Sequence, residues 1–376
     1  MRKLFVTGAP RTGTTLLDKL LSMHPRVTVH SQPLPLLYVR LKACYLEQSG
    51  HPLADDPYPL SDVFLANYYP PWEFAAFLRS TPIDPALCAE VLEEMVDYQG
   101  QYTRLREREV FLKHYSARSL HECFSSYCAA LSARDAEVIG AKESFCEEFI
   151  PYFLLHDVDV VQTIRDPRDS IASLSHGDAA AHSGSPRPLL FNVRQWRKSA
   201  AFALAHAGHR GFRLLRYEDL VSQPTEHVNQ ILLDVAVEPF GGGALETELR
   251  APEGHVWRSN SSHRPTSRVS RRSVGSHWRL LSGEVRRFIE ATCYYEMRAL
   301  GYEPELRPED IHGAIAQHTD ETPLHRPYLA SYRWSAERAR EEHRRIDAIQ
   351  RGVYDPRMFI FHETFAAIRR AADGPR

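Results

Sequence analysis

Near the start of the chain, the sequence Leu4-Phe-Val-Thr-Gly-Ala-Pro-Arg-Thr-Gly-Thr-Thr-Leu-Leu-Asp-Lys-Leu-Leu-Ser-Met-His24 changes character twice. Leu4–Val6 is apolar and predicts a short buried strand. Gly8 and Gly13 then favour a tight turn, and from Thr14 onward apolar residues recur at helical spacing. A strand, a glycine-containing loop and a helix in this order point backbone N–H groups and the positive end of a helix at an anion. The sequence therefore predicts a phosphate-binding loop.

This loop differs from those that bind nucleoside triphosphates. In the latter, Lys and then Ser or Thr follow the last glycine, but here Thr14 and Thr15 follow Gly13 and supply hydroxyl groups. The cation is Arg11, whose forked guanidinium suits a tetrahedral oxyanion.

The segment Ala-Pro-Arg-Thr-Gly-Thr-Thr-Leu-Leu, residues 9–17, resembles the 5′-phosphosulfate loop of sulfotransferases that use 3′-phosphoadenosine 5′-phosphosulfate (PAPS). It is most similar to the form in tyrosylprotein and bacterial sulfotransferases, in which arginine replaces the lysine of the cytosolic enzymes. The resemblance implies that the following loop residues bind the 5′-phosphosulfate: Arg11, Thr12, Gly13, Thr14 and Thr15.

The composition is that of an ordinary soluble globular protein. The chain has 376 residues, of which 43% are hydrophobic and 25% charged, so it could hold two average domains or one large α/β domain with additions. Its formal net charge of −2 argues against a general nucleic-acid-binding protein and requires any basic site to be local.

We find no signal for secretion, membrane insertion or metal binding. Only Leu4–Val6 is apolar after Arg2 and Lys3, and no apolar run approaches the roughly 18 residues of a membrane span. The six cysteines form no Cys-x-x-Cys pair, and the 19 histidines form no helical zinc pattern. We therefore expect buried free thiols, a cytoplasmic location and no metal.

The rest of the chain predicts an α/β fold. Apolar runs predict further strands at Val27–His30, Val110–His114, Glu137–Lys142, Val158–Ile164 and 211–215. Helices are predicted at about 118–133, after Pro167, at 191–208 and at 283–300. This alternation is typical of a three-layer, P-loop-like fold with a central, mostly parallel sheet and helices on both faces.

Two regions are additions to this core. Residues 33–109 are expected to form a mostly helical, aromatic insertion on the acceptor side, although the aromatic residues equally suit a helical core. Beyond a sulfotransferase domain of residues 1–303, residues 304–376 form a C-terminal helical extension. Its densely charged helix at Ser335–Gln350 is expected to be solvated, because mixed charge usually lies on a surface.

A second phosphate site is predicted at the end of Val158–Ile164. Ligands of α/β sheets lie outside the carboxyl ends of the strands, where Arg165 follows the strand and Ser173 lies in the next helix. An arginine and a serine there can hold a phosphate together with the start of that helix. Arg-Asp-Pro-Arg-Asp-Ser-Ile-Ala-Ser, residues 165–173, resembles the 3′-phosphate motif of PAPS-dependent sulfotransferases, which implies that Arg165 and Ser173 bind the 3′-phosphate.

Two later segments resemble the same family. Leu214–Val221 is similar to its Tyr-Glu-Asp-Leu segment, which implies that Tyr217 lies near the adenosine. Ser270–Trp278 resembles the family's Arg-Lys-Gly-x-x-Gly-Asp-Trp loop, which closes on the 3′-phosphate and implies that Arg271, Arg272 and Ser273 take part. We expect a stiffer loop here, because four positions depart from the pattern: Arg272 for lysine, Ser273 and Ser276 for the glycines, and His277 for aspartate. The whole resemblance covers about residues 3–303.

The expected reaction is an in-line transfer of a sulfuryl group from a phosphate leaving group to an acceptor oxygen. As in phosphoryl transfer, positioning and charge neutralisation should provide most of the catalysis. Arg11 can neutralise the charge that grows on the 5′-phosphate. Lys142 resembles the lysine of the Asn-Lys-Asp-Pro-Phe segment in tyrosylprotein sulfotransferases and is a second catalytic cation, unless it is a surface cation paired with Glu143.

Several residues are candidates for the general base. The glutamate that tyrosylprotein sulfotransferases carry after the first helix is replaced by His-Ser-Gln at residues 30–32. Cytosolic sulfotransferases use a histidine in a Lys-Thr-His segment, which Lys113-His114 partly matches at an expected strand end. An imidazole with a pKa near neutrality suits this role. The first candidate is therefore His114, and the alternatives are His30, Glu143 and Glu147.

The sequence thus predicts a PAPS-dependent sulfotransferase that acts on a hydroxyl group of a small molecule, carbohydrate or peptide, without nucleic-acid partner or membrane span. A P-loop kinase is disfavoured because Thr14 occupies the lysine position and no magnesium aspartate stands out. A non-catalytic PAPS-binding protein on the same fold is a third hypothesis, because the family's glutamate is missing. Formation of a homo-oligomer and contact of the extension with the active site are left open.

Overall fold

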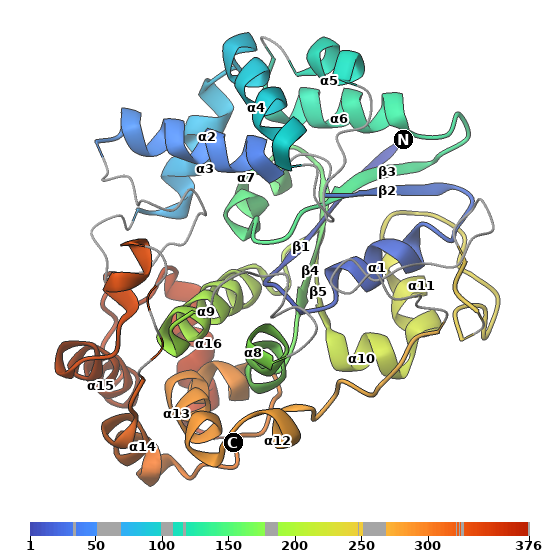
Figure 1. Ribbon diagram of the computed structural model, residues 1–376. Helices are drawn as coiled ribbons and strands as arrows, with labels where there is room; N and C mark the ends of the chain where they lie inside the picture. The colour runs from blue at the N-terminus through green and yellow to red at the C-terminus, as the bar shows by residue number, and fades with distance from the viewer. Residues whose placement is uncertain are drawn as a thin grey trace.

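The computed structural model describes residues 1–32, 35–50, 69–98, 108–115, 118–176, 187–246, 248–250, 268–320, 322, 324 and 327–374. A five-stranded parallel sheet in the order β2-β3-β1-β4-β5 forms its centre (Figure 1). The strands are β1 Arg2–Gly8, β2 Val27–Ser31, β3 Val138–Lys142, β4 Asp159–Ile164 and β5 Phe212–Arg216. The predicted α/β fold with a parallel sheet is confirmed, and each of these strands lies where an apolar run predicted one.

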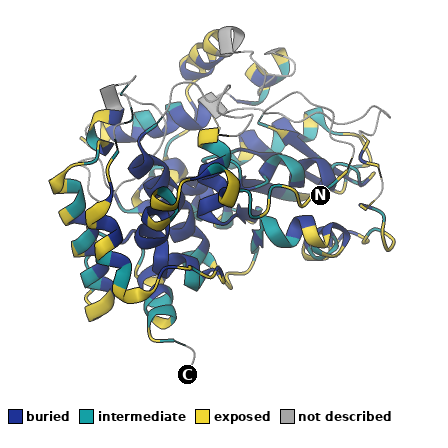
Figure 2. Cartoon of the chain, turned by 60° about the horizontal axis from the view of Figure 1, so that its bottom comes forward, coloured by how far each residue is buried: buried dark blue, intermediate teal, exposed yellow. Residues whose placement is uncertain are grey.

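Helices cover both faces of the sheet. Alternate residues of a strand face opposite ways, so Leu4 and Val6 pack into one apolar cluster with α1 and α11, and Phe5 packs into a larger cluster on the other face. Figure 1 shows α1, α10 and α11 on one side of β1, β4 and β5, with α8 and α9 on the other. The helices nearest the sheet are α1 Thr14–Leu21, α6 Leu120–Leu131, α7 Ile150–Leu154, α8 Pro167–His176, α9 Leu189–His206, α10 Tyr217–Ser222 and α11 Pro224–Asp234. Figure 2 shows that the elements at the centre of the molecule consist largely of buried residues.

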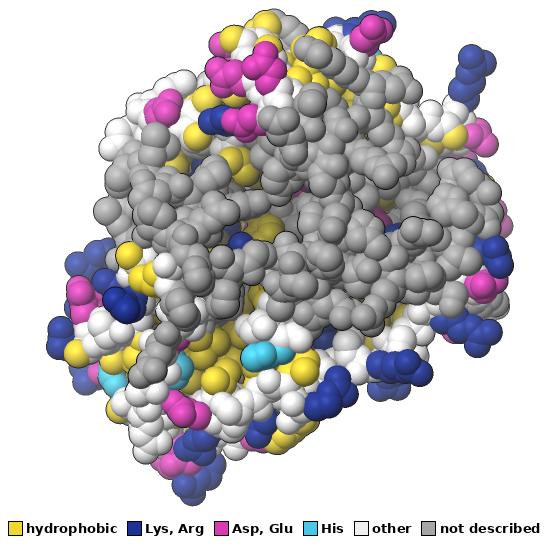
Figure 3. Space-filling view, viewed as in Figure 1, with side chains coloured by type: hydrophobic (Ala, Val, Ile, Leu, Met, Phe, Trp, Pro, Cys, Tyr) yellow, Lys and Arg dark blue, Asp and Glu magenta, His cyan; other side chains and the backbone are white. Residues whose placement is uncertain are grey.

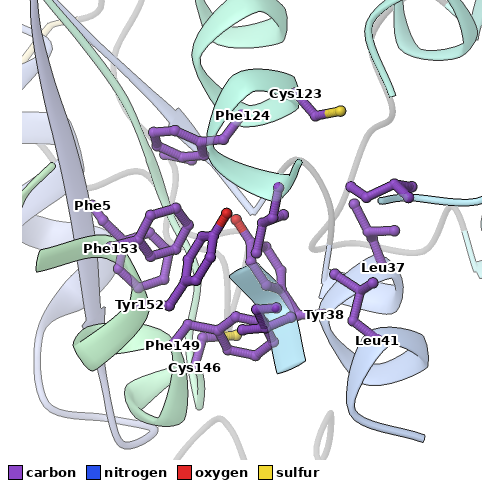
Figure 4. Close-up of a cluster of buried hydrophobic side chains, with 14 of the residues drawn as sticks. Phe5, Leu37, Tyr38, Leu41, Cys123, Phe124, Cys146, Phe149, Tyr152 and Phe153 are labelled. Carbon is purple, nitrogen blue, oxygen red and sulfur yellow. The ribbon is translucent and has the colours of Figure 1, made fainter. Parts of the chain in front are cut away.

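The insertion is helical in its described part, as predicted. It contains α2 Pro35–Gln48, α3 Pro71–Ser80 and α4 Pro85–Tyr98, whereas residues 33–34, 51–68 and 99–107 lie outside the described residues. Tyr38 of α2 and Phe124 of α6 gather with Phe149 around Phe5 of β1 (Figure 4). Tyr38 is 1% exposed, so it belongs to a core rather than to an open pocket.

The predicted strand Val110–His114 is wrong. These residues belong to helix α5, Arg108–His114, which packs against α4 and α6. Phe111 and Tyr115 are fully buried and their rings stack 5.0 Å apart, whereas Leu112 lies exposed between them. An apolar pair four residues apart marks one face of a helix, and over so short a run it is easily mistaken for a strand.

The C-terminal part of the chain is helical and packs against α9. It contains α12 His277–Leu280, α13 Gly283–Ala299, α14 Ile311–Gln317, α15 Ala336–Arg351 and α16 His362–Ala372, with short 3-10 turns at η2 Pro308–Asp310 and η3 Pro327–Tyr332. Apolar residues of α13, α14, α15 and α16 form one common cluster. The extension is thus joined to the core through α13 and α9, which both contact α16.

The expectation that the charged helix α15 is solvated is wrong for one of its faces. Glu341, Glu342 and Arg345 are buried. The guanidinium of Arg194 on α9 lies 2.9 Å from Glu341 and 3.0 Å from Glu342, and Arg197 Nη2 donates to Glu342 at 3.0 Å. A count of charges along α15 misses this, because the partner charges come from α9, about 150 residues earlier.

The pKa of Glu342 indicates how the stability of the fold depends on pH. Burial alone would raise the pKa of Glu342, but the guanidinium groups of Arg197 and Arg194 outweigh burial and lower it from the usual 4.5 to about 2. A carboxyl group with a lowered pKa in the folded state stabilises the fold above its unfolded pKa, and this contribution is lost as the pH falls from about 4.5 toward 2. Breaking a buried ion pair from one side costs about 3–5 kcal/mol.

We therefore expect Glu342→Gln to lower the melting temperature strongly at pH 7, and the difference from the parent protein to shrink as the pH is lowered from 5 to 3. Thermal unfolding followed by circular dichroism at each pH measures both effects. Glu337→Gln is the matched control, because Glu337 lies on the same helix but is exposed. Equal melting temperatures of the two variants at pH 7 would contradict the expectation.

Charges of both signs are mixed on the surface. Among the side chains coloured in Figure 3, Lys and Arg are interspersed with Asp and Glu around the edge of the molecule. This agrees with the formal net charge of −2, which gives no reason to expect a long-range attraction for nucleic acid. Basic residues that bind a ligand must therefore act locally.

Candidate functional site

Two glycines, Gly8 and Gly13, allow the loop between β1 and α1 to pack closely against its neighbours. Gly13 adopts φ 97°, and a Cβ atom there would lie 2.6 Å from Cδ2 of Tyr217. A Cβ atom on Gly8 would lie 2.5 Å from the carbonyl oxygen of Thr163 on β4. Both glycines are therefore required for close packing of the loop against β4 and α10. Gly13 is also the N-cap of α1, and no side chain caps this helix, so its first N–H groups stay open to an anion.

The hydroxyl groups of the loop have different tasks. Thr12 is fully buried; its hydroxyl donates to the carbonyl oxygen of Ala9 at 2.6 Å and lies 2.8 Å from Thr163 Oγ1. Thr12 thus fastens the loop to β4. Thr14 Oγ1 lies 3.4 Å from Ser144 Oγ, in the segment that follows β3. The loop is held between the ends of β3 and β4, the two strands that flank β1.

Residues predicted for the two phosphate sites meet at this point. Nε of Arg11, in the loop, donates to Ser173 Oγ on α8 at 2.9 Å, although the two residues are 162 positions apart. Arg165, at the end of β4, donates from Nη1 to the carbonyl oxygen of Arg11 at 3.2 Å. Its guanidinium also lies over the ring of Tyr217, 4.5 Å from the ring centre. Hydrogen bonds therefore connect the first loop directly to the second motif.

The segment at 268–276 closes on the same residues. Tyr217 Oη lies 2.7 Å from Ser273 Oγ, and Arg165 Nη2 donates to the carbonyl oxygen of Ser273. Arg271 and Arg272 are exposed and stand outside this network among the described residues. Of the three residues predicted in this segment, Ser273 is thus the one that the structure joins to Arg165 and Tyr217.

Asp169 anchors this segment and was missed by the sequence analysis. The backbone N–H groups of Gly275 and His277 donate to its carboxylate at 2.7 and 2.9 Å, and His277 Nδ1 lies 2.8 Å from Oδ1. Arg165 Nη2 lies 3.7 Å away. Burial would raise the pKa of Asp169, but the hydrogen bonds from His277 and the charge of Arg165 lower it. His277, which stands where the family pattern has aspartate, thus pairs with the carboxylate of Asp169 on α8.

Lys142 lies at the end of β3 and is fully buried, so it is not the surface cation of the alternative interpretation. Its Nζ atom donates to Gln32 Oε1 at 3.2 Å and to Thr15 Oγ1 at 3.3 Å, and lies 3.5 Å from Asp18 Oδ2. Gln32 stands at one of the positions where tyrosylprotein sulfotransferases carry the glutamate. Here that position supplies an amide oxygen to the lysine.

The structure does not bring His114 to the loop. His114 ends helix α5, which lies at the top of Figure 1, on the far side of α6 from the loop at the start of α1. The reason is that Val110–His114 is part of a helix: a strand of the sheet would have ended at the edge that carries the site, whereas helix α5 does not. His30 lies on β2, and its Nε2 atom is 3.3 Å from Ser132 Oγ at the end of α6.

The carboxylates Glu143 and Glu147 lie in the segment that leaves β3. This segment is tied to β1 and the loop, since the backbone N–H groups of Glu143 and Phe145 donate to the carbonyl oxygens of Val6 and Gly8 at 2.9 and 3.1 Å. Glu147, which opens the 3-10 turn η1 Glu147–Phe149, is 1% exposed. Its Oε2 atom has no hydrogen-bond partner among the described residues.

Three general expectations can be compared with the structure. All six cysteines are free, and five are buried, with Cys44 half-buried. Within the described part of the chain, no group of three or more His, Cys, Asp or Glu side chains has the arrangement of a metal site. None of the described helices combines the length and the apolar composition that a membrane crossing requires.

One comparison with known protein families gives a match in the first part of the chain. Residues 3–63 match the sequence model of the Sulfotransferase family. The segment that includes β1, the phosphate loop, α1 and β2 is therefore similar to sulfotransferases, in agreement with the family and the class of enzyme predicted from the sequence. No curated protein matches the sequence.

Solved structures of sulfotransferases are similar at low sequence identity. The sulfotransferase domain from the curacin biosynthetic pathway is 16% identical, with a TM-score of 0.41, over 81% of this chain and 99% of that chain. The sulfotransferase domain of the Synechococcus PCC 7002 olefin synthase is 16% identical, with a TM-score of 0.37, over 75% and 88% of the two chains. The sulfotransferase STF9 from Mycobacterium avium is 15% identical, with a TM-score of 0.36, over 81% and 78%.

Proposed function

We propose that this protein transfers the sulfuryl group of PAPS to a hydroxyl group of a small molecule, carbohydrate or peptide. The observation that carries the proposal is the meeting of Arg11, Ser173 and Arg165 at the open start of α1. Two cations from separate motifs at one helix start suit a ligand with two anionic groups. A nucleotide with phosphate groups at both the 5′ and 3′ positions is such a ligand.

The residues present fit PAPS as a donor substrate. The N–H groups at the start of α1, with Arg11, Thr14 and Thr15, would hold the 5′-phosphosulfate. Arg165, Ser173 and Ser273 would hold the 3′-phosphate, with Asp169 fixing the segment that carries Ser273. Lys142 lies behind Thr15 and adds positive charge on the 5′ side.

In the transfer, a bond forms between the acceptor oxygen and the sulfur atom, and the bond between sulfur and the bridging oxygen of the phosphosulfate breaks. The electron pair of the broken bond stays on the phosphate oxygen, where Arg11 and Lys142 would neutralise it. The acceptor hydroxyl loses its proton to a general base. We place the acceptor on the side of the insertion, residues 33–109, because η1, which follows Glu143, contacts α3 of that insertion.

We propose Glu147 as the general base, because it lies in the segment that leaves β3 beside the loop and its buried carboxylate has an oxygen without a hydrogen-bond partner among the described residues. Glu147→Gln should then lower kcat by about 10²–10⁴-fold, the usual contribution of a general base, with unchanged binding of 3′-phosphoadenosine 5′-phosphate (PAP). Steady-state rates and calorimetric titration measure the two quantities. Glu143→Gln tests the alternative carboxylate, which also lies beside Lys142. Full activity of the Glu147 variant, or loss of activity in the Glu143 variant alone, would contradict the assignment.

Transfer of ³⁵S from labelled PAPS to a panel of phenols, sugars and tyrosine peptides tests the proposed activity. We expect label to appear in at least one class of acceptor without added metal. If label never leaves PAPS but PAP binds tightly, the protein is a binding protein on this fold. If the protein instead consumes ATP with magnesium, it is a kinase.

A further inference from the structure

The pair formed by Lys142 and Asp18 is buried directly beneath the phosphate loop. Lys142 is 0% exposed and Asp18, on α1, is 3% exposed. An ammonium group has three N–H donors, and three oxygen atoms surround this one at 3.2, 3.3 and 3.5 Å, from Gln32, Thr15 and Asp18. Gln32 and Thr15 thus accept hydrogen bonds from Lys142, and Asp18 supplies a negative charge at ion-pair distance.

The hydroxyl group of Thr15 connects Lys142 to the phosphate loop. Thr15 is the second residue of α1 and accepts from Lys142 through Oγ1. A hydroxyl group can accept one hydrogen bond and still donate another. Thr15 can therefore accept from the ammonium group of Lys142 and donate a hydrogen bond to an anion bound in the loop. Asp18 lies three residues further along the same helix, and residues three apart share one face of a helix.

Asp18 is needed to keep this lysine charged. Burial lowers the pKa of Lys142, and the carboxylates of Asp18 and Glu143 counteract burial. Burial also raises the pKa of Asp18, against the effect of Lys142. Lys19 is a further cation beside the pair, and burial lowers its pKa as well. Without Asp18, the protonated form of Lys142 would lose its ion-pair partner on α1.

We propose that Asp18 is a positioning residue for the transfer reaction: it holds Lys142 against Thr15 and keeps its ammonium charge available to the leaving phosphate. This inference rests on the proposed function. It assigns a task to a residue that the motifs do not mark, because Asp18 follows the loop at a helical position of no special pattern in the sequence.

The test compares the parent protein with Asp18→Asn, which removes the charge and keeps the size. Removal of Asp18 lowers the pKa of Lys142, so the charged form is lost at lower pH. The alkaline limb of the kcat profile should therefore move to lower pH by about one unit, and each unit corresponds to a tenfold change in the equilibrium. Binding of PAP at a pH below the alkaline limb of both proteins should change less than about threefold, which is well under the tenfold change of one pH unit.

Two further variants separate charge from structure. Lys19→Gln removes a positive charge beside the same pair. In this variant the alkaline limb of the kcat profile should stay in place or move to higher pH. In Asp18→Asn with Lys142→Arg, the guanidinium stays charged, so the alkaline limb should return toward that of the parent. If Asp18→Asn does not fold, as judged by its melting temperature, Asp18→Ser replaces it.

The pKa of Lys142 can also be measured without any assay of function. In protein labelled with ¹³C-lysine, the Cε signal that is missing from Lys142→Arg should titrate at lower pH in Asp18→Asn than in the parent. Equal titration in both proteins, or a kcat that falls equally at all pH values, would overturn the proposal. Failure of the proposed function would instead show as a parent protein that neither binds PAP nor transfers sulfate.

Discussion

Replacing Arg11 by alanine should lower kcat for sulfuryl transfer by about 10²–10³-fold, the effect of removing one preorganised group that stabilises charge in a transition state. Arg11 is the cation of the loop, and its Nε atom is already directed to Ser173. Its charge is needed most when the bond to sulfur breaks and negative charge grows on the phosphate. The binding of PAP, which lacks the sulfuryl group, should weaken less than kcat falls.

The conservative variant Arg11→Lys is the matched control. It keeps the charge but loses the forked geometry and the Nε donor to Ser173, and we expect it to retain activity within about tenfold of the parent, because the ammonium group still neutralises the charge that grows on the phosphate. Rates at saturating PAPS and calorimetric titration with PAP measure the two effects separately. An Arg11→Ala enzyme with the parent kcat would show that the loop does not serve the chemical step.

Replacing Arg165 by alanine should weaken PAP binding by about 100-fold, which lies within the 2–5 kcal/mol measured for truncation of buried charged partners. Arg165 is 3% exposed and connects the loop, Tyr217 and Ser273. Its removal would take away the cation of the 3′ site and one of the contacts that hold Ser273. The affinity for 5′-AMP, which has no 3′-phosphate, should change little.

The comparison of the two nucleotides makes this experiment specific. A general loss of structure would weaken both, whereas loss of the 3′ site weakens PAP alone. Arg271→Ala is the control, because Arg271 is exposed and outside the network. If Arg165→Ala bound PAP as tightly as the parent, the assignment of the 3′ site would be wrong.

Local patterns in the sequence predicted the sheet and the place where the two motifs meet. Apolar runs mark the buried strands, and parallel strands necessarily bring their carboxyl ends to one edge. Arg11 and Arg165 follow neighbouring strands β1 and β4, so their proximity follows from the strand order. The proximity of residues that local motifs mark could therefore be predicted without a structure.

Other features depend on partners that are distant in the sequence. His277 pairs with Asp169 across 108 positions, and Glu342 pairs with Arg197 across 145. Asp18 becomes significant only because β3 places Lys142 beside it. The error at Val110–His114 has a local cause instead, since a short apolar run fits a strand and a helix equally well until the burial of Phe111 and Tyr115 decides.

The central claim is that one site holds two phosphate groups of one nucleotide. Calorimetric titration of the parent protein with PAP, 5′-AMP and ATP, all without metal, tests it most directly. We expect tight binding of PAP and much weaker binding of both other nucleotides, because only PAP can engage Arg165 and the loop together. Equal affinity for PAP and 5′-AMP, or a preference for ATP, would contradict the account.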